Sequence, residues 1–228
     1  MRYKWILFDA DNTLFDYDAA ELGALNSTFE ELGRPLLPDN ITTYRHINHQ
    51  NWQAFERGEI TQVILRTHRF EQFMAALSIK EEPLPVTQRY LHHLGNRTDL
   101  IPGAQELIEA LDGRVGLMII TNGFKDVQRS RMAQSEIGRY FHDIVISEEV
   151  GSAKPDGRIF DVAFERMGRP PKSQVLIVGD SLTSDIQGGL DYGIDTCWFN
   201  PGGRPNGLGR EVGFEIGRLE ALLEILRR

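Results

Sequence analysis

Two carboxylates lie one residue apart at the end of the first apolar segment of the chain. Residues 4–8 are followed at once by Asp9 and Asp11, with a single alanine between them. Like charges at this spacing repel each other and raise each other's pKa, so the pair is a poor choice for stability alone. A nearby cation or a shared proton makes such a pair tolerable. The pair therefore indicates a site that holds a cation or handles protons.

Three later segments of the chain could complete this site. Each follows a short apolar run that is typical of a buried strand. The polar residues that follow are Thr121, Asn122 and Gly123 after one run, Lys154 after the next, and Asp180 and Asp185 after the last. Ligands of open parallel sheets bind beyond the carboxyl ends of the strands. We therefore expect these residues to converge on Asp9 and Asp11.

The elements that must position these residues alternate between strand and helix. The expected strands cover residues 4–9, 115–121, 143–147, 174–179 and 194–199, and the expected helices cover 103–111, 124–136, 156–167 and 184–192. Such alternation predicts an α/β fold, in which a parallel sheet is covered by helices on both faces. Residues 200–209 are rich in glycine and proline and are expected to form a surface loop.

A long segment between the first strand and the rest of the sheet has a different pattern. Apolar residues recur at helical spacing and no strand is expected. The two clearest sets are Leu22, Leu25, Phe29 and Leu32, and then Val63, Thr67, Phe70, Met74 and Leu77. A third helix is expected near Ile41, Tyr44, Trp52 and Phe55, with breaks at residues 33–35, at Gly58 and around 83–85. We predict a core of residues 1–16 and 98–228 with a helical insertion of residues 17–97.

The four polar segments together resemble the signature motifs of the haloacid dehalogenase-like hydrolase superfamily, in the order and at the strand positions typical of that family. The resemblance spans the chain from Trp5 to about Phe199. It implies a Rossmann-like parallel sheet in a three-layer α/β/α core, with an inserted helical cap of the first type. Asn12 stands where many members have glycine, and asparagine tolerates left-handed backbone better than most residues.

The resemblance also implies the chemistry of a phosphomonoester hydrolase. Asp9 is expected to attack phosphorus and form an aspartyl-phosphate, while Asp11 transfers protons. Lys154 would hold the nucleophile and offset charge, and Thr121 with the N–H groups of Asn122 and Gly123 would bind the phosphoryl oxygens. The expected ligands of Mg²⁺ are Asp9, the backbone carbonyl of Asp11, Asp180 and, directly or through a water, Asp185.

Some segments are similar to the pyrimidine 5′-nucleotidase branch of the superfamily. They are residues 121–124, residues 146–151 with 154–155, and the turn at residues 58–61. This resemblance implies a nucleoside monophosphate as substrate. A planar base needs an apolar or aromatic wall, for which the candidates are Phe15, Trp52 and Phe124. No feature of the sequence selects pyrimidine over purine.

Composition and charge limit the kinds of binding partner that the protein can have. The net charge is −8 and the sequence pI is about 5.3, which argues against a nucleic-acid polymer as partner. No apolar stretch approaches the roughly 20 residues that cross a bilayer, and no signal-peptide pattern is present. The lone Cys197 lies in an apolar run and is expected to be a buried structural thiol. These features suggest a cytoplasmic enzyme that acts on a small phosphorylated metabolite, and its oligomeric state is left open.

Other functions share parts of this pattern. A phosphatase of sugar phosphates or phosphoglycolate would keep the same core motifs, and a phosphomutase would have to retain the phosphoryl group and exclude water. A haloacid dehalogenase needs neither a metal nor an acid two residues after the nucleophile, so Asp11 and the later acidic pair argue against it. A phospho-accepting receiver module lacks a helical insertion after its first strand. The apparently complete set of catalytic residue types argues against a protein that only binds ligands.

Overall fold

The chain divides into two compact units in a computed structural model, which describes residues 2–227. The first unit comprises the residues up to Tyr17 and those from Thr98 onward, and the second comprises Asp18–Arg97. Each unit has its own buried core. The first unit carries all strands found in the described residues and all four motif segments.

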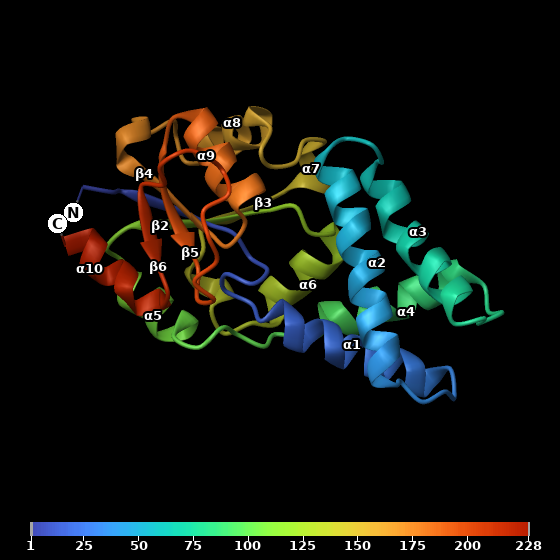
Figure 1. The fold of residues 1–228 in the computed structure, drawn as a ribbon. Coiled ribbons are helices and arrows are strands. Elements are labelled where there is room, and N and C mark those ends of the chain that lie inside the picture. Colours follow the sequence, from blue (N-terminus) through green and yellow to red (C-terminus); the bar gives the residue numbers. More distant parts are fainter. Residues whose placement is uncertain (1, 228) are drawn as a thin grey trace. The chain divides into compact units, whose positions relative to one another are not determined.

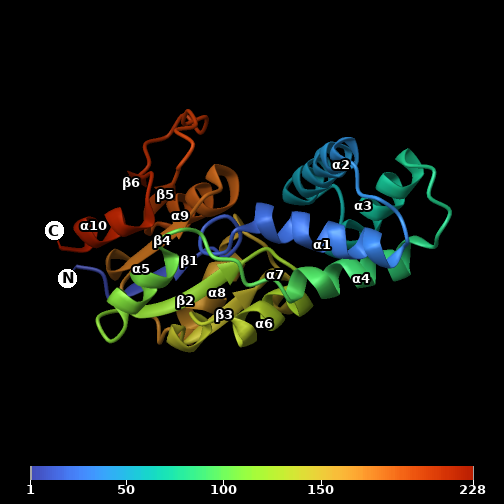
Figure 2. The same cartoon turned by 90° about the horizontal axis from the view of Figure 1, so that it is seen from below.

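The first unit is built on a parallel sheet of six strands in the order β3-β2-β1-β4-β5-β6. The strands are β1 (Trp5–Phe8), β2 (Gly116–Thr121), β3 (Asp143–Ile146), β4 (Val175–Gly179), β5 (Asp195–Phe199) and β6 (Phe214–Ile216). Figure 2 shows them following one another in this order across the unit. Strand β1 lies between β2 and β4, so the strand order reverses at β1, and ligands of open α/β sheets bind at such a point.

Helices cover both faces of this sheet because the central strands are apolar on both sides. Ile6 and Phe8 of β1 contribute to one core cluster, and Leu7 contributes to the other. The first cluster is covered by α5 (Ala104–Leu111), α6 (Lys125–Gln134) and α10 (Leu222–Arg227), and the second by α8 (Gly157–Arg166) and α9 (Gln187–Tyr192). Figure 1 shows these two groups of helices on opposite sides of the strands. The expectation of a three-layer α/β/α fold with a Rossmann-like parallel sheet is confirmed.

Short helical turns link the layers of the first unit. They are α7 (Ser147–Val150), three 3₁₀ turns (Gly138–Tyr140, Lys172–Gln174 and Leu219–Ala221) and a π-helical turn (Leu182–Ile186). Cys197 is buried in β5, and burial raises the pKa of its thiol to about 12. It is therefore the inert thiol that the sequence indicates.

The second unit contains four helices in the described residues and is stabilised by aromatic side chains. The helices are α1, which begins in the first unit (Tyr17–Glu31), α2 (Pro38–Glu56), α3 (Gln62–Ala76) and α4 (Pro83–Gly95). The ring of Tyr44 on α2 lies 5.1 to 5.6 Å from the rings of Phe70, Phe73 and Tyr90. Such contacts add to the apolar area that holds the helices together.

Three sequence expectations for the elements need correction. The prolines near residue 83 begin α4 instead of only breaking the chain, because the first turn of a helix does not use the missing N–H groups. Strand β6 and helix α10 were not expected. Val63, placed on the buried stripe of its helix, is 79% exposed in the first turn of α3, whereas Phe70 and Met74 of the same stripe are buried. None of the helices within residues 2–227 is both long and apolar enough to cross a membrane.

Candidate active site

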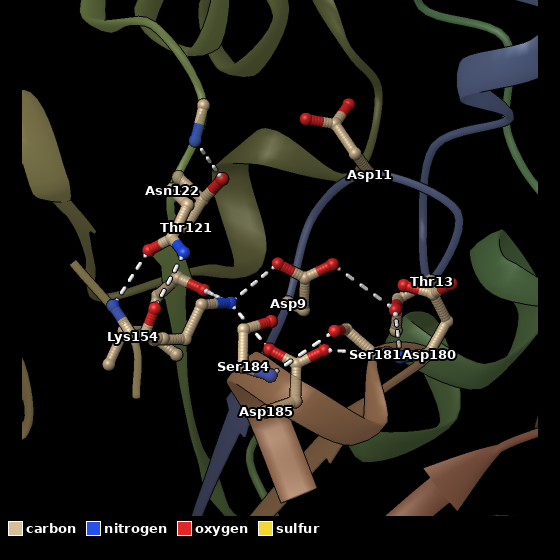
Figure 3. A network of polar contacts seen from close by, with 12 residues as sticks. Asp9, Asp11, Thr13, Thr121, Asn122, Lys154, Asp180, Ser181, Ser184 and Asp185 are labelled. Atoms are coloured by element: carbon tan, nitrogen blue, oxygen red, sulfur yellow. Dashed lines mark hydrogen bonds and ion pairs between the residues drawn. The ribbon is translucent and has the colours of Figure 1, made fainter. Parts of the chain in front are cut away.

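The site is centred on the ammonium group of Lys154. Its Nζ donates to Oδ1 of Asp9 at 2.6 Å, to Oδ1 of Asp185 at 2.7 Å and to the carbonyl of Ile120 at 2.7 Å (Figure 3). These bonds use all three donors of an ammonium group. Asp9 is 8% exposed and directly follows β1, and its N–H donates a hydrogen bond to the carbonyl of Val178. One buried cation thus joins the two predicted carboxylates.

The loop after β4 folds back so that the Asp185 carboxylate lies against the end of β4. Oδ2 of Asp185 accepts from the N–H of Ser181 at 3.0 Å, and the Ser181 hydroxyl accepts from the N–H of Ser184 at 3.2 Å. A side chain at Gly179 would place its Cβ 2.2 Å from that same Oδ2. Only glycine therefore lets the Asp185 carboxylate approach the end of β4.

Thr13 is a member of the site to which the sequence analysis gave no role. Its hydroxyl donates to Oδ2 of Asp9 at 3.3 Å and accepts from the N–H of Asp180 at 3.0 Å, and its side chain is buried. Thr13 therefore ties the loop after β1 to the loop after β4. Its position four residues after Asp9, within the first motif, was the signal that could have found it.

Asp180 is held mainly through its backbone. Its carbonyl accepts from Nε1 of Trp198 at 2.9 Å and from Nη2 of Arg204 at 2.6 Å, and the same Nη2 lies 3.7 Å from Oδ2. Arg204 comes from the glycine- and proline-rich segment after β5, so the expected surface loop also contributes a contact to the site. These contacts leave the Asp180 carboxylate at the edge of the site, with 23% of the side chain exposed.

Burial dominates the electrostatics of the acidic side chains. It holds the pKa of Asp9 well above its usual value, although Lys154 acts in the opposite direction. Burial, with Asp185 adding to it, raises the pKa of Asp180 to about 7. Burial alone would lower the pKa of Lys154, but the carboxylates of Asp185 and Asp9 outweigh it and keep that pKa above its usual value. The lysine is therefore charged, and the crowded acidic side chains beside it favour a bound proton or cation.

The loop after β2 supplies the donors expected to bind phosphate. Oγ1 of Thr121 accepts from the N–H of Gly123 at 3.0 Å, so the Thr121 proton can be donated elsewhere. The side-chain amide of Asn122 has another partner. Its Oδ1 accepts from the N–H of Lys154 at 2.8 Å and its Nδ2 donates to the Lys154 carbonyl at 2.9 Å. The Asn122 side chain thus fixes the segment that carries Lys154.

Asp11 points away from Asp9 (Figure 3), and both of its carboxylate oxygens meet side chains of α6. Its Oδ2 accepts from Nε2 of Gln128 at 2.7 Å, and its Oδ1 pairs with Nη1 of Arg131. Asn12 follows with a φ of 58°, the left-handed conformation that asparagine tolerates. Neither Gln128 nor Arg131 was singled out in the sequence, since polar residues three apart on a helix are common on exposed faces.

Of the three aromatic candidates for substrate contact, Phe15 and Phe124 lie in the first unit and Trp52 lies in the second. Phe15 is 1% exposed and belongs to the core cluster of the first unit, where the Arg131 guanidinium lies 5.6 Å from its ring. Its ring is thus used in packing. Trp52 is half-buried on α2 of the second unit, with its ring 5.8 Å from that of Phe55.

The carboxylates can form an oxygen-rich site for a hard divalent cation. One oxygen each from Asp9, Asp180 and Asp185 lies within 4.8 Å of the other two. Mg²⁺ prefers oxygen ligands and keeps several waters, and a divalent cation would offset the negative charge that raises the pKa of Asp180. Both oxygens of Asp185 accept hydrogen bonds, from Lys154 and Ser181, and each keeps a lone pair for a metal ion or a metal-bound water. The residues therefore fit the predicted metal.

Comparisons with known proteins agree with this geometry. The chain is 38% identical to the HAD-hydrolase YfnB of Bacillus subtilis, whose crystal structure, described as bound to magnesium, covers 100% of both chains with a TM-score of 0.94. It is 35% identical to the pyrimidine 5′-nucleotidase YjjG of Escherichia coli, over 99% of both chains. It is 34% identical to the pyrimidine 5′-nucleotidase PynA of Streptococcus pneumoniae, over 99% of this chain and 96% of that one.

More distant structures share the fold alone. The L-2-haloacid dehalogenase of Xanthobacter autotrophicus is 17% identical, with a TM-score of 0.78 over 99% of this chain and 98% of that one. Residues 3–193 match the family described as haloacid dehalogenase-like hydrolase. With that match, the whole-length relatives and the aspartate–lysine cluster at the strand ends, the chain belongs to the haloacid dehalogenase-like hydrolase family.

Proposed function

We propose that this hydrolase is a Mg²⁺-dependent phosphatase of nucleoside 5′-monophosphates that works through an aspartyl-phosphate, with pyrimidine nucleotides favoured. The observation that carries the phosphatase chemistry is the bond of Lys154 to both Asp9 and Asp185. A carboxylate held by a buried cation beside further acidic ligands can attack a phosphate dianion, because the charges that oppose the attack are offset. The uncatalysed reaction is so slow that enzymes supply rate factors up to ~10²¹.

In the first step, a carboxylate oxygen of Asp9 forms a bond to phosphorus as the bond to the leaving oxygen breaks. Asp11, protonated at this stage, gives its proton to that oxygen, and the alcohol leaves. The Thr121 hydroxyl, which accepts from the N–H of Gly123, holds the phosphoryl oxygens together with the N–H of Asn122, and Lys154 fixes the direction of attack. The products of this step are the aspartyl-phosphate and the Asp11 carboxylate.

In the second step, water attacks the phosphorus of the aspartyl-phosphate and gives a proton to the Asp11 carboxylate. The bond between Asp9 and phosphorus breaks, inorganic phosphate leaves, and both aspartates return to their initial states. Asp9, Asp180 and the carbonyl of Asp11 would hold Mg²⁺, with Asp185 bound to it directly or through a water. The metal, when present, supplies positive charge next to the transferring phosphoryl group.

The nucleotide part of the proposal is supported by two whole-length relatives that are named pyrimidine 5′-nucleotidases. It is also supported by the local sequence similarity in the second and third motifs and at residues 58–61. Of the three aromatic candidates for a wall against the base, Phe15 and Phe124 are buried in the first unit, whereas Trp52 is half-buried in the second. Trp52 is therefore the aromatic side chain that we assign to this role.

The test is a comparison of kcat/KM for phosphate release from UMP, dTMP, AMP, a sugar phosphate and phosphoglycolate. We expect the pyrimidine nucleotides to be best, and Trp52→Ala to reduce their kcat/KM more than that of phosphoglycolate. A tenfold preference for a sugar phosphate or phosphoglycolate, ~1.4 kcal/mol in transition-state binding, would show that the nucleotide assignment is wrong while the phosphatase assignment stands. Transfer of the phosphoryl group to a sugar without steady phosphate release would instead indicate a mutase.

A further inference from the structure

Two side chains of α6, Gln128 and Arg131, contact the carboxylate of Asp11 and have no role in the steps proposed above. Asp11 is half-buried, and both of its oxygens accept from the same helix, α6. Gln128 and Arg131 are three residues apart and therefore lie on one face of that helix. Gln128 is 1% exposed and Arg131 is 0% exposed. Two long polar side chains are thus buried where they contact one carboxylate.

Burying polar side chains costs free energy unless their polar atoms are paired. Nη1 of Arg131 pairs with Asp11 while its guanidinium lies over the ring of Phe15, so its position is fixed by an ion pair and by packing. Oε1 of Gln128 is buried without a hydrogen-bond partner among the described residues. An unpaired buried amide oxygen costs free energy, and an apolar residue of similar shape would avoid that cost. Gln128 is therefore poorly explained by stability alone.

The backbone next to Gln128 is adapted to its presence. A side chain at Gly123 would place its Cβ 2.3 Å from Nε2 of Gln128, the atom that donates to Asp11. Gly123 also belongs to the loop expected to bind phosphate. The amide group of Gln128 therefore lies between that loop and Asp11, where it can fix the distance between the phosphoryl group and the proton carrier.

We propose that Gln128 and Arg131 are positioning residues for the general acid Asp11. This inference rests on the proposed function, because it gives them a purpose only if Asp11 transfers the proton. When Asp11 gives its proton to the leaving oxygen, negative charge develops on its carboxylate, and Arg131 and Gln128 are already in place to stabilise that charge. They also restrict the side-chain rotation of Asp11 from the side of α6.

A positioning role predicts a dependence on the leaving group that a purely structural role does not. A p-nitrophenolate ion leaves readily without a proton, whereas an alkoxide does not, so only alcohol release needs the acid. The experiment measures kcat/KM with p-nitrophenyl phosphate and with benzyl phosphate, two aromatic substrates of similar size. This parameter includes only the steps through loss of the leaving group, so the later role of Asp11 as a base does not enter.

The variants are Gln128→Met, Arg131→Lys and Arg131→Met, with Asp11→Asn as the reference. Arg129→Ala is the matched control, because Arg129 lies on the exposed side of α6 and pairs with Glu149. We expect Gln128→Met and Arg131→Met to lower kcat/KM for benzyl phosphate about tenfold or more, with less than about threefold loss for p-nitrophenyl phosphate. Arg131→Lys should recover part of the loss, and Arg129→Ala should leave both substrates unchanged.

The two ways to fail are distinct. If Asp11→Asn discriminates between the two substrates but Gln128→Met and Arg131→Met reduce both equally, this inference is wrong and the proposed function stands. If Asp11→Asn reduces both substrates equally, the acid assignment fails and this inference fails with it. Should Arg131→Met not fold, as judged by circular dichroism, Gln128→Met still decides, because removal of a partly unpaired amide is tolerated far better than removal of a buried charge.

Discussion

The ammonium group of Lys154 lies 2.6 Å from the carboxylate of Asp9 and 2.7 Å from that of Asp185, so one lysine separates two buried like charges. Removal of one partner from a buried ion pair leaves an uncompensated charge, which costs about 3–5 kcal/mol. We expect Lys154→Met to lower the free energy of unfolding by this amount in chelator, and by less in excess Mg²⁺, which can offset the same carboxylates.

Urea denaturation with and without Mg²⁺ measures both effects. Lys125→Met is the matched control, because Lys125 is an exposed lysine at the start of α6. It should change the free energy of unfolding by no more than about 0.5 kcal/mol, as most surface substitutions do. If the loss were the same with and without Mg²⁺, the cation would not bind next to these carboxylates.

Asp9→Asn is expected to abolish turnover while preserving the fold. The amide is close in shape to the carboxylate but cannot form an acyl phosphate. Phosphate release and circular dichroism on the same sample test both parts. Acid-quenched mass spectrometry should find a phosphorylated peptide around residue 9 in the wild type and not in the variant. Turnover near the wild-type rate, with contaminating phosphatases excluded, would falsify the nucleophile assignment.

Metal removal should stop the reaction. We expect chelator to abolish phosphate release and Mg²⁺ to restore it, with Mn²⁺ as a substitute, whereas Ca²⁺ should inhibit because its larger, looser shell spoils the in-line geometry. Mg²⁺ should also raise the melting temperature, since a ligand at one hundred times its Kd adds about 2.7 kcal/mol to stability. Asp180→Asn should weaken that shift, and an unchanged shift would remove Asp180 from the metal site.

Much of the fold follows from the sequence because strand ends carry local signals. The apolar runs that end at Thr121 and Gly179 are buried on both faces, and parallel topology alone brings their carboxyl ends together beside Asp9. The short strand β6 has no comparable signal, since three residues pairing at a sheet edge depend on β5 being in place. The start of α4 was misread because proline both breaks helices and begins them.

The site was harder to predict where side chains act on other side chains. Asn122 and Thr13 both lie in the motifs. However, the bond of Asn122 to the backbone of Lys154 and the link that Thr13 makes between two loops depend on distances across the sheet, which the sequence does not contain. Gln128 and Arg131 are polar residues on a helix, and sequence periodicity alone expects such residues to face solvent. Only the tertiary structure shows that they are buried against Asp11.

The stability of the second unit should depend on pH through Glu21. This side chain is buried on α1, and burial raises its pKa above the usual value of 4.5, although Arg45 donates to its Oε1 at 2.8 Å and acts in the opposite direction. The folded state therefore holds a proton at Glu21 more tightly than the unfolded state does. The resulting stability is fully present below the unfolded pKa and is lost as pH rises through the raised folded pKa.

Glu21→Gln removes this titration and keeps the shape of the side chain. We expect the wild type to lose more stability than the variant as pH rises from about 4 to 8, so that the variant is at least as stable at the upper end. Urea denaturation across this range gives the two slopes. Glu30→Gln is the control, because Glu30 is exposed near the end of the same helix and its replacement should leave the wild-type slope unchanged. Parallel curves for the wild type and Glu21→Gln would mean that Arg45 fully offsets the cost of burying the carboxylate.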